Sequence, residues 1–209
     1  PITIAAENDN YNITLVDGIY EIKKADILGI EFSNSEVVYD GNIHTLEITG
    51  ALPEKVSVSY FYNDSVFTGM TQQGSYLINA VFTNENPNYN DLANMNAVLT
   101  ITPKEITVSF TGYEGLIYTG NKQNITISLN GIIDGEVCEY TVIGNEGTNA
   151  GTYTCEVSSI TNANYTLLGQ TSLSWSIAKY QVEKPQEDTA VYTYTGESQT
   201  YQLSSSEYY

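Results

Sequence analysis

Short stretches that alternate apolar and polar side chains run along most of the chain. ITVSF at 106–110, NITISL at 124–129 and SLSWSIA at 172–178 place an apolar residue at every second position. This period of two is typical of a β-strand with one buried face. Clusters rich in Gly, Asn and Asp, such as NGIIDGE at 130–136, separate the stretches and indicate turns. The pattern therefore predicts an all-β protein.

The alternation also predicts which side chains point into the core. Trp175 and Ile177 share one face of the 172–178 strand, so we expect both to be buried. Tyr153 and Cys155 share one face of the preceding strand in the same way. The same strand occurs in two other copies. Trp175 is replaced there by Leu99 and Tyr20, and Ile177 corresponds to Ile101 and Ile22.

These copies belong to a repeat of roughly 77 residues. Three segments align without gaps: VVYDGNIHTLEI at 37–48, LIYTGNKQNITI at 116–127 and TYTGESQTYQL at 193–203. QGSYLINAV at 73–81 aligns with AGTYTCEVS at 150–158. The frame predicts the tail of a preceding repeat, two complete repeats and the head of a following repeat, at 1–24, 25–103, 104–179 and 180–209. We expect either a longer parent molecule or end pieces that pair with strands elsewhere.

A set of tyrosines and glycines forms the signature of the repeat: Tyr39, Gly41, Tyr76, Tyr118, Gly120, Tyr153, Tyr194 and Gly196. Asp40, between the first Tyr and Gly, becomes Thr119 and Thr195 in the other copies, so it is not a carboxylate that every repeat needs. The recurring glycine indicates a turn or bulge with positive φ. We interpret the signature as structural.

The segment NAGTYTC, with Tyr153 two residues before Cys155, resembles the tyrosine corner of immunoglobulin domains. The resemblance implies an immunoglobulin-like β-sandwich of about seven strands per repeat. The other cysteine, Cys138, is only 17 residues upstream and no Trp lies between the two, which departs from the immunoglobulin pattern. A helix within 92–99 is the alternative, and it would favour a β-grasp-like module.

The series YDG or YTG, GTY and then NANY resembles the MBG/YDG type of bacterial extracellular repeat, alongside the bacterial immunoglobulin-like domains. This resemblance covers nearly the whole chain, although its motifs are short. It implies a non-catalytic module of an adhesin or cell-wall stalk at the cell surface or in secreted form. It transfers no catalytic site and no cofactor.

The charge balance excludes one large class of partners. The chain carries 25 acidic residues against seven basic ones, all lysines, for a net charge of −18. A cationic face for nucleic acid cannot be built from this set. No apolar run approaches the roughly 20 residues of a membrane span, so we expect no membrane insertion in this segment.

Few residues are candidates for chemistry. Cys138 and Cys155 face apolar neighbours on strands that we expect to form a hairpin centred on Glu146 and Gly147, so a disulfide is predicted; two buried free thiols are the alternative. His44 is the only histidine, and we expect it on the surface of a strand. A zinc site or a catalytic triad would need more such residues, so the sequence predicts no enzyme. Calcium could bind oxygen-rich loops at 7–10, 84–91 and 134–136, or these loops are simply turns.

Two functions fit this reading. The first is a structural stalk whose partners are neighbouring repeats or other copies, and pairing of the incomplete end repeats would extend it into a filament. The second is binding of a host glycan or protein on tyrosines outside the repeat signature: Tyr60, Tyr62, Tyr113, Tyr192 and Tyr208.

Overall fold

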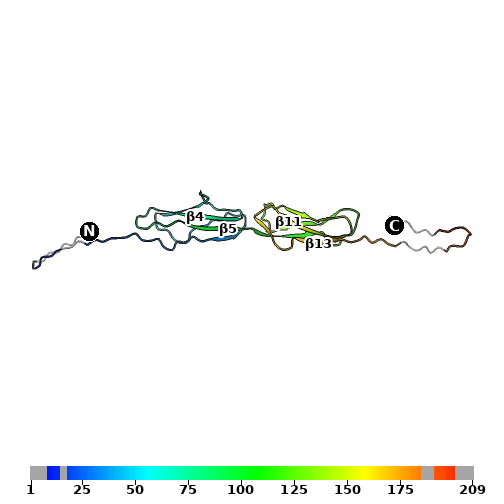
Figure 1. Ribbon diagram of the computed structural model, residues 1–209, viewed down its shortest axis with the longest axis horizontal. Coiled ribbons are helices and arrows are strands. Elements are labelled where there is room, and N and C mark those ends of the chain that lie inside the picture. Colours follow the sequence, from blue (N-terminus) through cyan, green and yellow to red (C-terminus); the bar gives the residue numbers. More distant parts are fainter. Residues whose placement is uncertain (1–8, 15–17, 185–190, 201–209) are drawn as a thin grey trace. The chain divides into compact units, whose positions relative to one another are not determined.

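The computed structural model describes residues 9–14, 18–184 and 191–200. The chain forms two compact units, residues 1–104 (unit 1) and 105–209 (unit 2). Only Pro103 separates the last strand of the first sheet from the next strand of the chain. β4 and β5 lie side by side in unit 1, and β11 and β13 do so in unit 2 (Figure 1).

Unit 1 is built on one five-stranded sheet. Its strands are β1 (Ser35–Val38), β2 (Val56–Tyr62), β3 (Ser65–Val66), β4 (Gly74–Asn84) and β5 (Met95–Thr102), in the spatial order β1-β5-β4-β2-β3. β1 runs parallel to β5, and the other neighbours are antiparallel. The alternation of the sequence places Ile78, Ala80 and Leu99 on the buried face, where each is at most 1% exposed.

A second layer of unit 1 consists of extended segments joined by single bridges. Glu31 pairs with Thr49, and His44 pairs with Met70. The Tyr60 side chain of β2 connects this layer to the sheet, because its ring lies 5.7 Å from that of Phe32 and its hydroxyl accepts a hydrogen bond from the backbone N–H of Ile48.

Unit 2 contains three small sheets. Its strands are β6 (Lys104–Thr111), which begins at the last residue of unit 1, β7 (Gln123–Asn124), β8 (Thr126–Asn130), β9 (Tyr140–Ile143), β10 (Glu146–Gly147), β11 (Gly151–Ile160), β12 (Tyr165–Leu167) and β13 (Ser172–Ile177). The spatial orders are β13-β11-β9, β12-β6-β8 and β10-β7.

The core of unit 2 joins these sheets face to face. Cys155 of β11 and Trp175 of β13 pack with Ile125, next to β8, and with Phe110 of β6. Trp175 stacks on Tyr153 at 4.7 Å between ring centres, and its indole N–H donates to the carbonyl of Gly144. The prediction that Trp175 belongs to the core is confirmed, since it is 3% exposed.

Equivalent positions make the same pairings in both units. The backbone N–H of Tyr39 donates to Thr102, and that of Tyr118 donates to Ala178. The bridge between Glu31 and Thr49 matches the pairing of β6 with β8, and the bridge between His44 and Met70 matches that of β7 with β10. The predicted all-β, immunoglobulin-like sandwich is therefore confirmed for each unit.

The alternative with a helix within 92–99 is wrong. Met95 to Thr102 form β5, in which Ala97, Leu99 and Ile101 alternate with more exposed residues and are each at most 2% exposed. A period of two fits a strand that buries one face, and a helix would have rotated these residues out of the core.

Candidate interaction surfaces

The first copy of the repeat signature is a capped turn. The carboxylate of Asp40 accepts hydrogen bonds from the backbone and side chain of Asn42 at 2.9 and 3.1 Å, and lies 2.8 Å from Nε2 of His44. The bonds from Asn42, aided by His44, lower the pKa of Asp40 to about 2. In the second copy, the Thr119 hydroxyl accepts from the backbone N–H of Asn121. Asp and Thr can replace each other here because both cap a turn through a side-chain oxygen.

The glycines of the signature adopt one conformation. The φ angles of Gly41, Gly120 and Gly196 are 80°, 79° and 76°. This left-handed region disfavours residues with a Cβ atom, which explains why Gly recurs while its neighbour varies.

A tyrosine corner is present in both units. The Tyr76 hydroxyl donates to the carbonyl of Gln72 at 2.8 Å, and that of Tyr153 donates to Asn149 at 2.7 Å. Each bond reaches back four residues, as in the corner of immunoglobulin sandwiches. These tyrosines therefore fix the entry to β4 and β11.

The predicted disulfide is wrong: both cysteines are buried free thiols. The prediction centred the turn on Glu146 and Gly147, but Ile143 pairs with Glu156, which centres it three residues later. Cys155 consequently lies opposite Leu173 on β13, and Cys138 precedes β9 altogether. A disulfide needs Cα atoms within about 7 Å, which this register does not provide.

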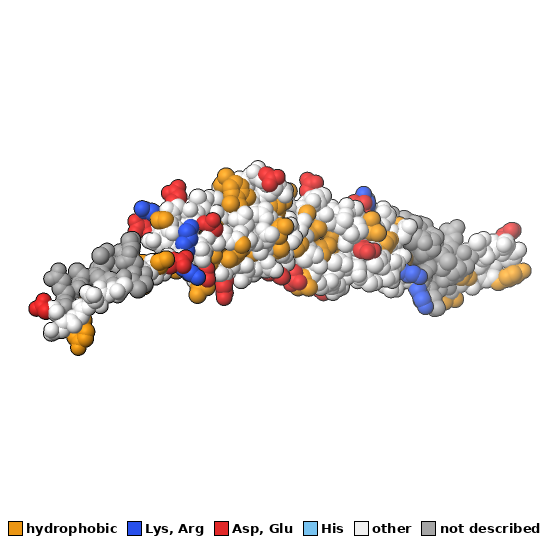
Figure 2. Space-filling model, turned by 60° about the vertical axis from the view of Figure 1, so that its left-hand side comes forward, with side chains coloured by type: hydrophobic (Ala, Val, Ile, Leu, Met, Phe, Trp, Pro, Cys, Tyr) orange, Lys and Arg blue, Asp and Glu red, His pale blue; other side chains and the backbone are white. Residues whose placement is uncertain are grey.

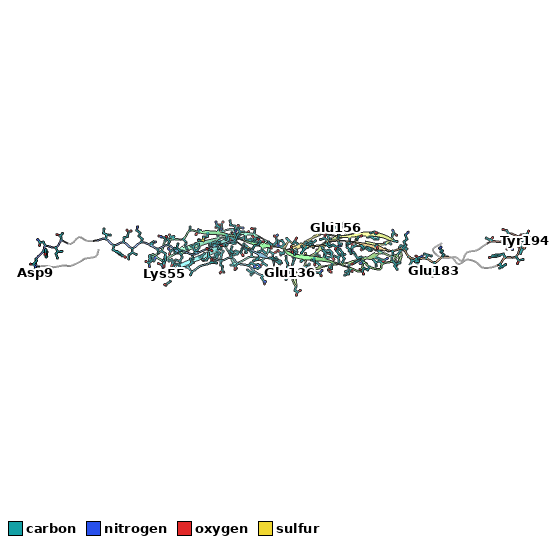
Figure 3. The ribbon with its side chains drawn as sticks, turned by 90° about the horizontal axis from the view of Figure 1, so that it is seen from below. Asp9, Lys55, Glu136, Glu156, Glu183 and Tyr194 are labelled. Carbon is teal, nitrogen blue, oxygen red and sulfur yellow. The ribbon has the colours of Figure 1, made fainter. Side chains whose placement is uncertain are left out.

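Cys138 instead belongs to a second buried cluster. Tyr165, 4% exposed, donates its hydroxyl to Glu136 at 2.7 Å and accepts the backbone N–H of Ile133. Burial and the bond to Glu136 raise the pKa of Tyr165, and nearby Cys138 contributes. Glu136 (labelled in Figure 3) thus holds a loop in place.

The oxygen-rich loops are organised as turns. Asn84 and Asn86 each accept, on the side-chain oxygen, the backbone N–H two residues ahead, and Asn162 does the same. Within the described residues, no three His, Cys, Asp or Glu side chains are grouped to hold a metal ion. The calcium prediction for 7–10 falls partly outside the described residues.

Three of the predicted binding tyrosines are packing residues. Tyr60 and Tyr62 are half-buried, with Tyr62 edge-on to Tyr76 at 5.4 Å, and Tyr113 packs against the core of unit 2. The prediction that these three are exposed platforms is wrong, because alternation along β2 turns Tyr60 and Tyr62 to its inner face and Tyr113 packs on the core after β6 ends. Tyr192 is 53% exposed and stays a candidate. Tyr208 lies outside the described residues.

Core-type residues are exposed in the two end segments. Tyr20 and Ile22 are 75% and 83% exposed, whereas their equivalents in the complete repeats, Leu99, Ile101, Trp175 and Ile177, are at most 3% exposed. Tyr194 (labelled in Figure 3) is 91% exposed, against 4% and 39% for the equivalent Tyr39 and Tyr118 in the complete repeats. The burial of these residue types therefore depends on neighbours that the end segments lack in this structure.

An open groove of about 940 Å³ lies within unit 2. Ile117, Tyr118 and Gly120 line one part of it, and Lys179 and Tyr180 line another. Tyr118 is 39% exposed and Tyr180 is 53% exposed, so the groove presents two phenol rings to solvent. Tyr180 was not among the predicted binding tyrosines, and no sequence signal placed it beside Tyr118.

Acidic side chains are scattered over the visible surface, where lysines are few (Figure 2). The carboxylate of Asp40 and the other acidic residues do not meet in one cluster in the described part of the chain. In the same residues, no helix has the length and hydropathy required to cross a bilayer.

The comparisons with known proteins are sparse. No family model matches the chain, and none of the curated proteins matches it. Among solved structures, the chain is similar to the fibronectin(III)-like modules of Clostridium thermocellum CbhA, at 14% sequence identity and a TM-score of 0.28, over 77% of this chain and all of that one.

Proposed function

We propose that this chain is a non-catalytic structural segment of an extracellular surface protein, such as the stalk of an adhesin. The observation that carries the proposal is that two β-sandwich units with the same pairings follow one another with a single residue, Pro103, between their strands. A strand that leads directly into the next unit leaves little length for a flexible linker. The residues that recur in both units form turns and pack in the cores. A spacer needs such residues for its fold and needs no binding site.

Pulling on single molecules tests this proposal. A chain held at both ends should show two separate unfolding events of similar length. Each complete repeat of roughly 77 residues should release on the order of 250 Å of extended chain. One event of twice that length, or no resistance to force, would contradict a load-bearing role.

We also propose that the end segments pair with those of another copy and so build a filament. Tyr20, Ile22 and Tyr194 are exposed core-type residues. β1 and β5 show how their equivalents pair, since these strands run parallel with Val37 opposite Ile101. By this register Tyr192 of one copy would lie opposite Ile22 of another. Multi-angle light scattering should show polymers that disappear in a Tyr20→Ser, Ile22→Ser variant, and a wild-type chain that stays monomeric would refute the pairing.

Binding of a host glycan is the second candidate function, and the groove in unit 2 favours it. Tyrosine rings can hold sugars by their apolar faces, and Lys179 and Thr119 offer polar contacts beside Tyr118 and Tyr180. A glycan array should give hits that a Tyr180→Ala variant loses, while Tyr113→Phe serves as a control outside the groove. An array without hits would leave this candidate without support.

A further inference from the structure

The groove of unit 2 has two sides that come from distant parts of the chain. Residues 117–120, which include the repeat signature, line the first side. Lys179, Tyr180 and Val182 line the second side, which is the segment that follows β13, and Ala150 completes the lining. The groove therefore combines signature residues with residues outside the signature.

Backbone hydrogen bonds hold the two sides together. The N–H of Tyr118 donates to the carbonyl of Ala178 at 2.9 Å, and the N–H of Ala178 donates to the carbonyl of Leu116 at 2.8 Å. The turn at Gly120, with a φ of 79°, completes the first side. A ligand would therefore meet a backbone that is already ordered, and this order lowers the cost of binding.

The groove has a different charge from the rest of the molecule. The chain carries 25 acidic residues, yet among the described residues no Asp or Glu lines the groove, and Lys179 is the charged residue of the lining. Tyr180 and Val182 line it, whereas Gln181 and Glu183 (labelled in Figure 3) do not. This is the alternation of an extended chain, whose successive side chains point to opposite sides.

The lysines of unit 2 are concentrated at this groove. The unit contains three of them, Lys122, Lys179 and Lys184, and the first and last lie within two residues of a lining position. Lys122 pairs with Glu146 at 2.7 Å, whereas Lys179 forms no ion pair within the described part of the chain. The ammonium of Lys179 can therefore pair with a negatively charged ligand.

The equivalent positions of unit 1 do not form such a site. Tyr39 is 4% exposed where Tyr118 is 39% exposed. Lys104 stands at the position of Tyr180, so the second ring has no counterpart there. The repeat therefore folds without this pair of exposed rings, and its turns and cores do not account for them.

We propose that the groove binds an acidic saccharide, whose carboxylate pairs with Lys179 and whose sugar rings lie on Tyr118 and Tyr180. The proposal rests on the glycan-binding function considered above and names its ligand class. Tyrosine offers an apolar ring with a polar hydroxyl, and an ammonium forms charge-assisted hydrogen bonds with a carboxylate. The volume of about 940 Å³ lies within the range of about 300–1,000 Å³ for small-molecule sites, which leaves room for a short oligosaccharide.

The charge of the whole chain limits the number of acidic groups in the ligand. At a net charge of −18 the surface repels a polyanion, and this repulsion extends over roughly 8 Å at physiological salt. A saccharide with one carboxylate at Lys179 experiences less of this repulsion than a polymer with an acid on every ring. The preferred ligand is therefore a short glycan, or the end of a longer one, with a single acidic sugar.

Two matched disaccharides test the proposal. One is glucuronic acid β-1,4-linked to glucose, and the other is cellobiose, which has a hydroxymethyl group in place of the carboxylate. In titrations of the full chain followed by the amide NMR signals of residues 117–120, the acidic disaccharide should bind about threefold to fivefold more tightly, as expected of one exposed ion pair.

Three variants locate the effect. Lys179→Gln should give the two disaccharides equal affinity. Lys55→Gln in unit 1 (Lys55 is labelled in Figure 3) removes the same charge from the chain and should leave the preference unchanged. Tyr180→Ala should weaken the binding of both disaccharides, since both use its ring. Lys179 and Tyr180 are exposed, and an unchanged Trp175 fluorescence transition will verify that unit 2 remains folded.

The possible failures are distinguishable. Equal affinities in the wild type, or a preference that persists in Lys179→Gln, would overturn the acidic saccharide and leave glycan binding in place. Binding of neither disaccharide would overturn both the acidic saccharide and the glycan-binding function of the groove. Tighter binding of cellobiose would show that the charge of the chain outweighs Lys179, and it would also overturn the proposal.

Discussion

Ile22, Ile101 and Ile177 occupy equivalent positions of the repeat but differ in burial. Replacing each of them by Ala therefore tests whether burial determines how much the isoleucine stabilises the fold. Ile101 and Ile177 are 1% and 2% exposed, and Ile22 is 83% exposed. Change to Ala removes three carbon atoms, each worth about 0.8 kcal/mol when buried. A residual cavity adds to this, so we expect a loss of about 3 kcal/mol at either buried position, within the range of about 2–5 kcal/mol for such changes. At Ile22 the loss should stay below about 0.5 kcal/mol.

The single tryptophan makes the assay specific for one unit. Trp175 is buried in the core of unit 2, so its fluorescence follows the unfolding of that unit, whereas circular dichroism follows both. Ile177→Ala should lower the fluorescence midpoint by roughly 12 °C or more, given about 4–8 °C per kcal/mol for a domain of this size. Ile101→Ala should lower the unfolding midpoint of unit 1. Circular dichroism detects this change, and the fluorescence of Trp175 in unit 2 does not.

Dilute protein is needed for the third variant, because Ile22 is also part of the proposed end pairing. If Ile22→Ala lowered the unfolding midpoint of unit 1 as much as Ile101→Ala does, the exposed Ile22 side chain would contribute as much stability as a buried one. The link from burial to stability would then be refuted for this chain.

Three further predictions concern hydrogen bonds, charge and thiols. Tyr153→Phe and Tyr76→Phe should each cost about 1 kcal/mol in urea unfolding of their own unit, because each removes one corner hydrogen bond; a cost near zero would show that the bond is not formed in solution. Because the pKa of Asp40 is lowered from 3.8 to about 2 in the folded chain, its charged carboxylate stabilises unit 1 above pH 3.8, and this stabilisation is lost as the pH falls toward about 2. Asp40→Asn should therefore make the thermal midpoint of unit 1 depend less on pH between 3.8 and 2. An unchanged dependence on pH would contradict the turn contacts. Because Cys138 and Cys155 are free and buried, a reductant should not move any unfolding midpoint, and both thiols should react with a thiol reagent only in denaturant; a midpoint lowered by reductant would reinstate the disulfide.

The local sequence pattern was sufficient to predict the strands and which of their side chains face the core. The alternation that ends in Trp175 and Ile177 identifies buried residues because a strand has only two faces. The recurrence of Gly41 beside a variable residue identifies a backbone requirement, because positive φ is a property of one residue and its neighbours. The tyrosine corner at Tyr153 likewise depends on contacts only four residues apart.

Contacts between distant segments could not be derived in this way. A shift of three residues in the turn before β11 separated Cys138 from Cys155, and no local signal specifies that register. Tyr60 was expected on the surface, but its hydroxyl meets Ile48 from the opposite layer.

The sequence by itself determined the all-β class, the repeat, the inner faces and the positive-φ glycines, because each of these depends on residues close together in the chain or on comparison between copies. Only the tertiary structure decided the register of β9 with β11, the separation of the two thiols and the burial of Tyr60, Tyr62 and Tyr113. These depend on which strands become neighbours, and a shift of a few residues in pairing changes the partners without changing the alternation.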